Sequence, residues 1–367
     1  MLKDIRISSK QAIYINITLV IATGWLSAPA FIAEQSKQDA WISLIVAIFL
    51  SLPVAWATSK LSSLYPGQTL IEYLVEILGL WPGKILAFLY LLWFIHITSI
   101  MHREYSEFLT DVFMPETPLV VFPIVTTIII AYTVKKGLEV IARTVEIFFP
   151  WIILSVILIF LLLIPDMDIN RLLPVYDSDA ICIFKGSLVP TAWMTEIFTF
   201  AMIIPFLTKP QQSLKVTFLS IIFVGLNFLF NVIGSLLVFG PFLSTITYPV
   251  LNAGRLINIA NFLQRPDPII MAIWVAGGLM KIAVFYFVIV YGLAQWLGLK
   301  DYRPLVLPIG VILIALSIII ANSTIELSFF LAYIWPFYSL LLFQFAIPVI
   351  LLMIAFAKKK ILPKNTP

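Results

Sequence analysis

Charged residues are scarce in this chain of 367 residues: Asp, Glu, Lys and Arg together make up 11% of it. Soluble domains have roughly 25% charged residues, whereas this chain is 61% hydrophobic, with a mean hydropathy of +1.05. The net charge is only +4, so a nucleic-acid partner is not indicated. The composition excludes an ordinary soluble domain and favours a multi-pass protein of the lipid bilayer.

Cysteine and histidine are also rare, with one cysteine, Cys182, and two histidines, His96 and His102. One cysteine forms neither an intramolecular disulfide nor a cysteine metal cluster. The two histidines are six residues apart, which places them on different faces of a helix. The sequence also lacks a phosphate-binding loop, a dinucleotide fingerprint and the common hydrolase motifs. We therefore expect no metal, no cofactor and no enzymatic activity.

Long apolar runs are what the chain has in abundance. A bilayer core needs about 20 apolar residues per helix. Ten candidate spans meet this requirement, at residues 11–33, 40–59, 85–103, 119–134, 145–164, 187–206, 216–240, 269–296, 304–321 and 328–357. Most of the 23 lysine and arginine residues then fall on the cytoplasmic side if both termini are cytoplasmic. We expect an all-α integral membrane protein with ten transmembrane helices and both ends in the cytoplasm.

The ten spans divide into two halves of five, at residues 11–164 and 187–357, joined by an acidic outer loop at 165–186. Because each half crosses the membrane an odd number of times, the second half starts on the opposite side from the first. The two halves are therefore inverted relative to each other. Inverted repeats with a site near the membrane midplane are typical of transporters. An amphipathic stretch follows the second span of each half, at 70–80 and 249–263, and each is predicted to form a short helix along the membrane interface. We expect one transmembrane domain that covers residues 1–367.

The first span of each half contains residues that weaken helices. They are Gly24 and Pro29 in the first span, and Pro190 and Pro205 in the sixth. A break in a helix frees backbone groups, so it persists in a membrane only beside protein or a polar cavity. The end of a half-helix also favours a charged group. We predict that helices one and six are broken and hold the two ends of a zwitterion; the alternative is a proline kink without a ligand.

Two charged residues, Glu196 and Lys281, lie near the middle of the sixth and eighth spans. A charge at the bilayer centre costs at least ~2.5–3.5 kcal/mol, so it faces a partner or a cavity. The sequence leaves three interpretations open. The two residues form a static ion pair, or Glu196 contacts a ligand or controls a gate, or the pair titrates as a proton relay.

Together these features resemble the LeuT-type amino acid–polyamine–organocation superfamily, with its five-plus-five inverted repeat and its broken helices one and six. Within that superfamily, the chain is most similar to the endospore germination permeases, the B subunits of spore germinant receptors. Four motifs carry this resemblance, at residues 23–29, 103–109, 195–197 and 273–281. Thr195 is a departure, because the family often has glycine before the acidic residue of the sixth span.

The resemblance implies a membrane subunit that senses a nutrient germinant, an amino acid, sugar or nucleoside. It also implies an inner spore membrane location and partner A and C subunits, the latter a lipoprotein. The alternatives are a proton-coupled amino acid permease and a scaffolding protein with a vestigial pocket. By the superfamily pattern we expect ligand contacts from Thr23, Gly24, Trp25, Leu26, Ser27, His96, Thr98, Ser99, Trp193, Thr195 and Glu196.

Coupling or gating is expected from a second set of residues, namely Glu196, Lys281, Arg103 and Glu107. Arg103 and Glu107 are i, i+4 neighbours on one helix face, where an ion pair forms readily. In superfamily members that use protons, a lysine takes the position of a coupling sodium ion. The resemblance therefore implies that Lys281 replaces such an ion near the first-span break.

Overall fold

The computed structural model describes residues 5–259, 263–264 and 267–361, and these residues are mostly helical. Six helical segments are long and apolar enough to cross a membrane, and the bent pair Arg303–Ile319 and Thr324–Ile334 makes a seventh. One of the six, Ser9–Leu64, contains two helices. Each of the ten predicted ranges falls on helical structure, but the count of ten spans stays a prediction.

The first part of the chain forms six helices. They are α1 (Ser9–Ser36), α2 (Ala40–Leu64), α3 (Leu70–Leu78), α4 (Leu80–Val112), α5 (Val121–Lys136) and α6 (Leu138–Leu162). Reciprocal side-chain caps start α1 and α3, through Ser8 with Gln11 and Thr69 with Glu72. The amphipathic stretch at 70–80 thus forms the short helix predicted for it. Short 3₁₀ turns follow α1 and α6, namely η1 (Lys37–Asp39), η2 (Ile164–Asp166) and η3 (Ile169–Leu172).

The second part begins with α7 (Ala180–Met194), so the predicted outer loop at 165–186 ends at Asp179 instead. After α7 come the 3₁₀ segments η4 (Thr195–Met202), η5 (Ile204–Phe206) and η6 (Pro210–Gln212), then α8 (Ser213–Phe239) and η7 (Gly240–Thr245). Buried Asp39 holds the loop before α7 in place, because its carboxylate accepts hydrogen bonds from the backbone N–H groups of Tyr176 and Ser178 at 2.7 and 2.8 Å.

The chain continues with α9 (Pro249–Gly254) and a short antiparallel pair, β1 (Asn258–Ile259) and β2 (Leu263–Gln264). The predicted helix at 249–263 is therefore much shorter than expected, and its residues 260–262 lie outside the described part of the chain. Next come α10 (Asp267–Leu297), η8 (Arg303–Leu305), α11 (Val306–Ile319) and α12 (Thr324–Phe329). Two π-helical segments, η9 (Phe330–Ile334) and η10 (Pro336–Ala346), lead into α13 (Ile347–Ile361).

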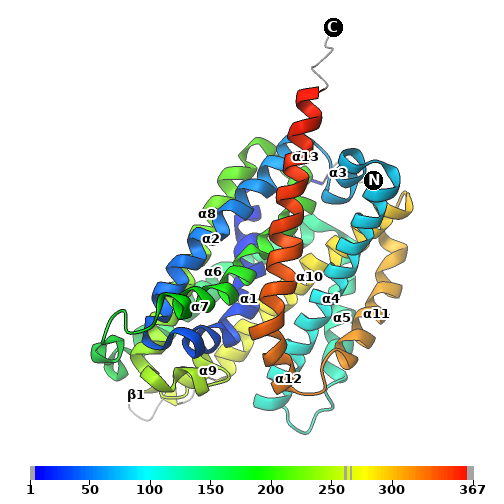
Figure 1. The fold of residues 1–367 in the computed structure, drawn as a ribbon. Helices are drawn as coiled ribbons and strands as arrows, with labels where there is room; N and C mark the ends of the chain where they lie inside the picture. The colour runs from blue at the N-terminus through cyan, green and yellow to red at the C-terminus, as the bar shows by residue number, and fades with distance from the viewer. Residues whose placement is uncertain (1–4, 260–262, 265–266, 362–367) are drawn as a thin grey trace.

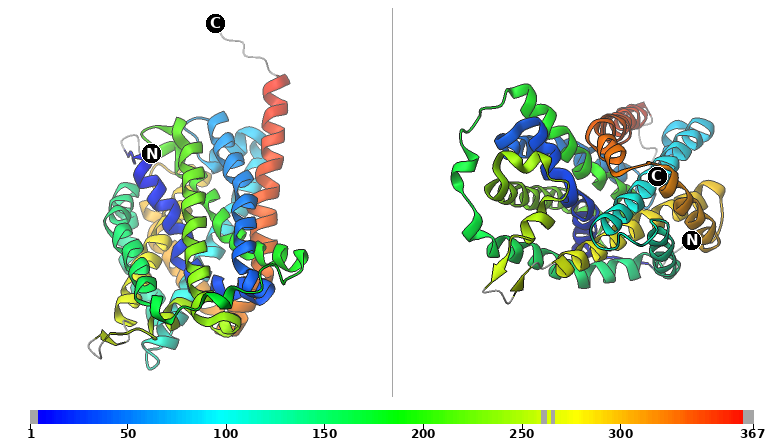
Figure 2. Two further views of the ribbon diagram at one scale, coloured as in Figure 1. Left: turned by 90° about the vertical axis from the view of Figure 1, so that its left-hand side faces the viewer. Right: turned by 90° about the horizontal axis from the view of Figure 1, so that it is seen from below.

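Helix α1 lies inside the bundle and is buried along most of its length (Figure 1). It packs against α2, α7 and α8 on one side and against α6 and α10 on the other. Helix α4 packs against α3, α10 and α11. The start of α1 and the end of α13 lie at the same end of the bundle, which agrees with termini on one side of the membrane (Figure 2).

The predicted break in the first span is wrong, because α1 is one continuous α-helix through Thr23 and Pro29. Gly24 has a packing role instead. A Cβ atom on Gly24 would lie 2.3 Å from Cζ of Phe228, so only glycine lets the α8 ring rest against the α1 backbone. A glycine in a membrane helix thus marked a close approach of two helices, not an unwound segment.

The predicted break in the sixth span is present, as a change of helix type. The α-helix ends at Met194, and the next eight residues form the 3₁₀ segment η4. Runs of 3₁₀ helix longer than three or four residues are uncommon and often mark a hinge or strain. The last span carries a second irregularity that the sequence did not predict, the π-helical segments η9 and η10.

Candidate functional site

Lys281 ties three helical segments together in the interior. Its Nζ atom lies 2.7 Å from Oε2 of Glu196 in η4 and 2.6 Å from Oγ1 of Thr23 in α1. Lys281 is fully buried and Glu196 is 1% exposed. Buried charges need this degree of pairing, because an unpaired one is strongly destabilising. We name Lys281, Glu196 and Thr23 the ammonium junction; it makes the ion pair that mid-span charges require.

The other predicted contacts of the first span are side-chain groups, because a continuous α1 leaves its backbone hydrogen-bonded. Leu26 lines a small enclosed cavity together with Thr23. Ser27 faces a larger outer hollow. Trp25 is buried, and its indole N–H has no partner among the described residues. The continuous helix thus leaves no free backbone group at residues 23–27, and the polar side chains of this segment that line a cavity are those of Thr23 and Ser27.

In the sixth span, Thr195 begins η4 and connects it to the last span. Its hydroxyl group lies 2.7 Å from the carbonyl oxygen of Thr191 and also contacts Oε1 of Gln344 in η10. Gln344 in turn donates to Oγ of Ser339 at 3.0 Å, and Trp93 of α4 donates to the same oxygen at 3.2 Å. This buried chain links the 3₁₀ segment, the π-helix and α4.

Trp193, in contrast, packs with its ring parallel to that of Phe31 at 6.3 Å. It is buried and lines none of the cavities found among the described residues. Its place therefore fits core packing between α7 and α1, and its predicted contact with a ligand stays a prediction.

The three polar residues of the third span do not meet the ammonium junction. The hydroxyl groups of Thr98 and Ser99 donate to carbonyl oxygens of their own helix, at Phe94 and Ile95, 2.6 and 2.9 Å away. His96 lines a separate hollow of about 200 Å³ beside α11 and α12. Helix periodicity alone did not reveal which face of α4 packs against α10.

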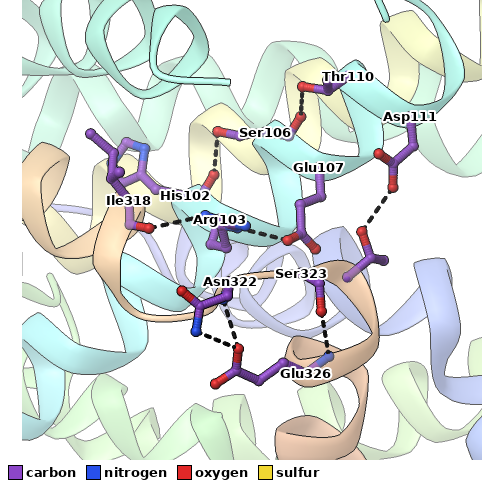
Figure 3. A network of polar contacts seen from close by, with 11 residues as sticks. His102, Arg103, Ser106, Glu107, Thr110, Asp111, Ile318, Asn322, Ser323 and Glu326 are labelled. Atoms are coloured by element: carbon purple, nitrogen blue, oxygen red, sulfur yellow. Dashed lines mark hydrogen bonds and ion pairs between the residues drawn. The ribbon is translucent and has the colours of Figure 1, made fainter. Parts of the chain in front are cut away.

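Arg103 and Glu107 form the predicted ion pair, with Nε and Oε1 2.7 Å apart and both residues buried. Figure 3 shows how Arg103 also reaches the carbonyl oxygen of Ile318 at 3.1 Å, near the end of α11. There α11 and α12 meet at a bend of 100°. The pair thus satisfies a free carbonyl at this bend, and Thr324, at the start of α12, donates to Asp111 at 3.0 Å.

Two cavities border neighbouring positions of α1. Thr23 and Leu26 line the first, and Ser27 lines the second. The enclosed cavity is about 10 Å³ and lies between α1, α4 and α10. A water molecule needs about 10–15 Å³, so this space holds one water at most. The outer hollow is about 250 Å³, and its lining includes Ser27, Glu34, Thr245 and Thr324. The structure is therefore closed at its centre and open toward the loops that contain Thr245 and Thr324.

Two buried residues outside the predicted set of ligand and gating residues lie near the ammonium junction or the enclosed cavity. Glu104 of α4 is 8% exposed and close enough to interact electrostatically with Lys281 and Glu196. Trp274 of α10 lines the cavity, and its buried indole N–H has no partner among the described residues. The signal for Glu104 was available, because it lies in the polar run that follows the third span. No group of three or more His, Cys, Asp or Glu in the described residues could hold a metal ion.

Solved structures with the same fold are transporters. The chain matches MhsT in complex with L-phenylalanine with a TM-score of 0.69, over 99% of this chain and 94% of that one, at 11% identity. It matches Mhp1, a nucleobase-cation-symport-1 family transporter, with a TM-score of 0.61 over 89% and 75% of the two chains, at 12% identity. These likenesses establish a LeuT-type fold, and with the long apolar helices they indicate a multi-pass integral membrane protein.

Sequence relatives are spore germination proteins. The chain is 25% identical to spore germination protein KB of Bacillus subtilis (strain 168), over 97% of this chain and 96% of that protein. It is 28% identical to the putative spore germination protein YfkT of the same organism, over 83% and 84% of the two chains. A family model described as spore germination protein matches residues 6–325. The chain therefore belongs to the spore germination permease family.

Proposed function

We propose that this protein is the nutrient-sensing membrane subunit of a spore germinant receptor and binds a small amino-acid-like ligand near the membrane midplane. The ammonium junction is the observation that carries the proposal. It joins α1, η4 and α10 through one buried lysine, and the enclosed cavity begins at Thr23. A ligand that enters there contacts Thr23, the member of the junction that lines the cavity.

The mechanism is a shift between two arrangements of the same helices. The ligand enters through the outer hollow and passes Ser27, one turn of α1 away from the enclosed cavity. A ligand shifts the equilibrium only by its difference in affinity for the two states. Contacts at Thr23 and Glu196 compete with Lys281, so ligand binding loosens the tie between α1 and η4. The segment η4 then moves against the rest of the bundle.

The membrane location and the partner subunits are also part of this proposal, and family membership supports them. The protein lies in the inner membrane of the spore with both termini on the cytoplasmic side, and it works with A and C subunits. The movement of η4 reaches these partners through Thr195 and Gln344, which connect η4 to the last span.

A germination assay tests the proposal. Spores whose only nutrient receptor contains this subunit are exposed to single amino acids, sugars and nucleosides, and loss of optical density is followed. We expect a response to at least one nutrient, which Glu196→Gln abolishes. Glu139→Gln is the control, because Glu139 forms an exposed ion pair with Arg143 in the first turns of α6. An unchanged dose response in Glu196→Gln spores contradicts the assigned site.

A proton-coupled permease is the second candidate, because the fold neighbours are transporters and Lys281 occupies the interior where α1 meets η4. Uptake of labelled amino acids into liposomes that contain this chain alone, under a pH gradient, separates the two candidates. The sensor proposal predicts binding without accumulation of the label.

A further inference from the structure

A hollow of about 370 Å³ lies between α5, α6 and α10, and the proposed mechanism does not use it. Ligand pockets in proteins are commonly ~300–1,000 Å³. All the residues that line this hollow are apolar except Thr133 and Thr144. We name it the three-helix groove; it has the size and the lining of a site for an apolar ligand.

The polar groups of the three-helix groove are already satisfied. The hydroxyl groups of Thr133 and Thr144 donate to carbonyl oxygens of their own helices, at Ile129 and Val140, 3.2 and 2.9 Å away. In the described part of the chain, no buried side-chain atom without a hydrogen-bond partner belongs to the lining. An apolar space of this kind stays free of water. The groove therefore suits an occupant made of hydrocarbon.

The groove opens toward the lipid and is as long as one leaflet. Two of its residues, Ile129 and Phe148, are 51% and 45% exposed, and both belong to predicted spans, at 119–134 and 145–164. Along α10 the lining runs from Ala272 to Ala283, about 16 Å at 1.5 Å per residue. Half of a bilayer's hydrocarbon core is about 15 Å thick. One acyl chain of a membrane lipid matches this length.

Helix α10 separates the groove from the ammonium junction. Ala276, Met280 and Ala283 recur at intervals of four and three residues, and they line the groove. Gly278 borders the enclosed cavity and Lys281 forms the junction. With 3.6 residues per turn, these two sets lie on opposite faces of α10. An occupant of the groove thus supports α10 from behind the junction and does not enter the nutrient site.

A lysine stands in line with the groove on α5. Ile129, Thr133 and Lys136 follow one another at intervals of four and three residues, so they share one helix face. Lys136 belongs to the last turn of α5 and is exposed. Its Nζ atom lies 5.3 Å from the centroid of the Tyr132 ring, and no carboxylate of the described residues forms an ion pair with it. Its charge is available to an anionic group.

The acidic side chains at this end of the bundle have other partners. Glu139 of α6 pairs with Arg143, and Glu146 of α6 pairs with Lys10 of α1 at 3.1 Å. The charge at the end of the groove is therefore positive. This is also the end at which α1 begins, proposed above to be cytoplasmic. Anionic lipids of the cytoplasmic leaflet attract basic side chains placed in this way.

We propose that the three-helix groove binds one acyl chain of an anionic phospholipid, with Lys136 contacting the phosphate of its headgroup. The inference goes beyond the proposed function, because the ligand is a lipid of the surrounding bilayer and not a nutrient. The bound chain fills the space behind Met280, the residue next to Lys281.

Native mass spectrometry of the purified full-length protein tests the site. The protein is freed of lipid in detergent and titrated with phosphatidylglycerol or with phosphatidylcholine that carries the same acyl chains. We expect the wild-type protein to bind one phosphatidylglycerol about fivefold more tightly than phosphatidylcholine, the effect of one lysine near the membrane surface.

Two variants assign the contacts with the acyl chain and the headgroup. Ala276→Phe places a ring in the groove, so the affinity for both lipids falls by more than about tenfold. Lys136→Gln lowers the affinity for phosphatidylglycerol by about fivefold and leaves that for phosphatidylcholine unchanged.

Each variant has a matched control. Ala315→Phe places the same ring on an exposed alanine of α11 outside the groove, and it should bind both lipids as the wild-type protein does. Lys135→Gln removes the same charge from the opposite face of α5 and should keep the preference for phosphatidylglycerol. Thermal unfolding of Ala276→Phe at the temperature of Ala315→Phe shows that the ring has not disrupted the fold.

Three outcomes overturn the assignment. Equal losses in Lys136→Gln and Lys135→Gln mean that the basic surface attracts headgroups without a site. Unchanged lipid binding by folded Ala276→Phe places the lipid elsewhere. A lipid-free dimer that Ala276→Phe disrupts assigns the groove to a second copy of the chain. None of these measurements uses a nutrient, so their failure leaves the proposed function standing, and an absent germination response leaves this site standing.

Discussion

The leading helices of the two predicted repeats, α1 and α7 with η4, differ where they were expected to match. Both contain glycine or proline in an apolar span, yet α1 stays a continuous α-helix while α7 changes to a 3₁₀ helix at Thr195. The difference lies in the neighbours. Gly24 accommodates the Phe228 ring, whereas Thr195 and Glu196 find partners in Gln344 and Lys281.

This asymmetry gives the two segments different roles in the proposed mechanism. A continuous α1 keeps its backbone groups satisfied and offers side chains to the site. The 3₁₀ segment has weaker backbone hydrogen bonds and depends on side-chain contacts for its geometry. Movement that follows ligand binding is therefore expected in η4, with α1 as the fixed reference.

The largest effect is expected from Lys281→Met. This change leaves the buried carboxylate of Glu196 without its partner and removes the tie to Thr23, so stability falls by roughly 3–5 kcal/mol. Thermal unfolding of the protein in nanodiscs measures the loss. The double variant with Glu196→Gln should recover part of it, because the uncompensated charge is then gone. Additive losses would mean that the two residues do not act as a pair.

Gly24→Ala tests the packing role of the glycine in α1. The new Cβ atom meets the Phe228 ring, so we expect a loss of about 1–3 kcal/mol, partly restored by Phe228→Leu. Gly277→Ala is the matched control, since a Cβ atom there lies 3.5 Å from the nearest neighbour. A loss in Gly24→Ala that no change at Phe228 relieves would favour a special backbone conformation instead.

Thr195→Val tests how far η4 depends on its side-chain contacts. The variant loses the contact with Gln344 and the bond to the Thr191 carbonyl, and we expect a loss of about 1–2 kcal/mol. Thr98→Val is the control, because the Thr98 hydroxyl bonds only to the carbonyl of Phe94. Equal unfolding temperatures of the two variants would show that the link to the last span contributes nothing.

Pro29→Ala should have the smallest effect. Because α1 is already helical at this position, alanine adds an N–H group and a better helix former. We expect a change within about 1 kcal/mol, toward higher stability, and an unchanged nutrient response in spores. A lost response with normal stability would show that the proline in α1 has a role in signalling.

The sequence predicted the parts of the site that depend on one strong physical constraint. Charges inside a membrane need partners, and this requirement correctly placed Glu196 and Lys281 in one interior site. The i, i+4 rule correctly paired Arg103 with Glu107. These predictions needed no knowledge of which helices are neighbours.

Predictions from the sequence were wrong or incomplete where one residue type has two possible structural roles. Glycine in a helix serves backbone freedom or close packing, and only the position of Phe228 decides between them. A hydroxyl such as that of Thr98 bonds either to a ligand or to its own helix, and the structure shows the second. The π-helical segment that begins at Pro336 contacts α4 through Trp93 and η4 through Thr195, and the sequence did not reveal these contacts.

Hydrogen exchange of backbone amides tests the asymmetry of the two leading helices most directly. Peptides that cover residues 23–29 and 195–202 are compared in the full-length protein in nanodiscs, with and without the stabilising nutrient. The account predicts slow exchange at 23–29 in both states and faster exchange at 195–202 that the nutrient changes. Equal protection of both segments, or a change confined to 23–29, would contradict it.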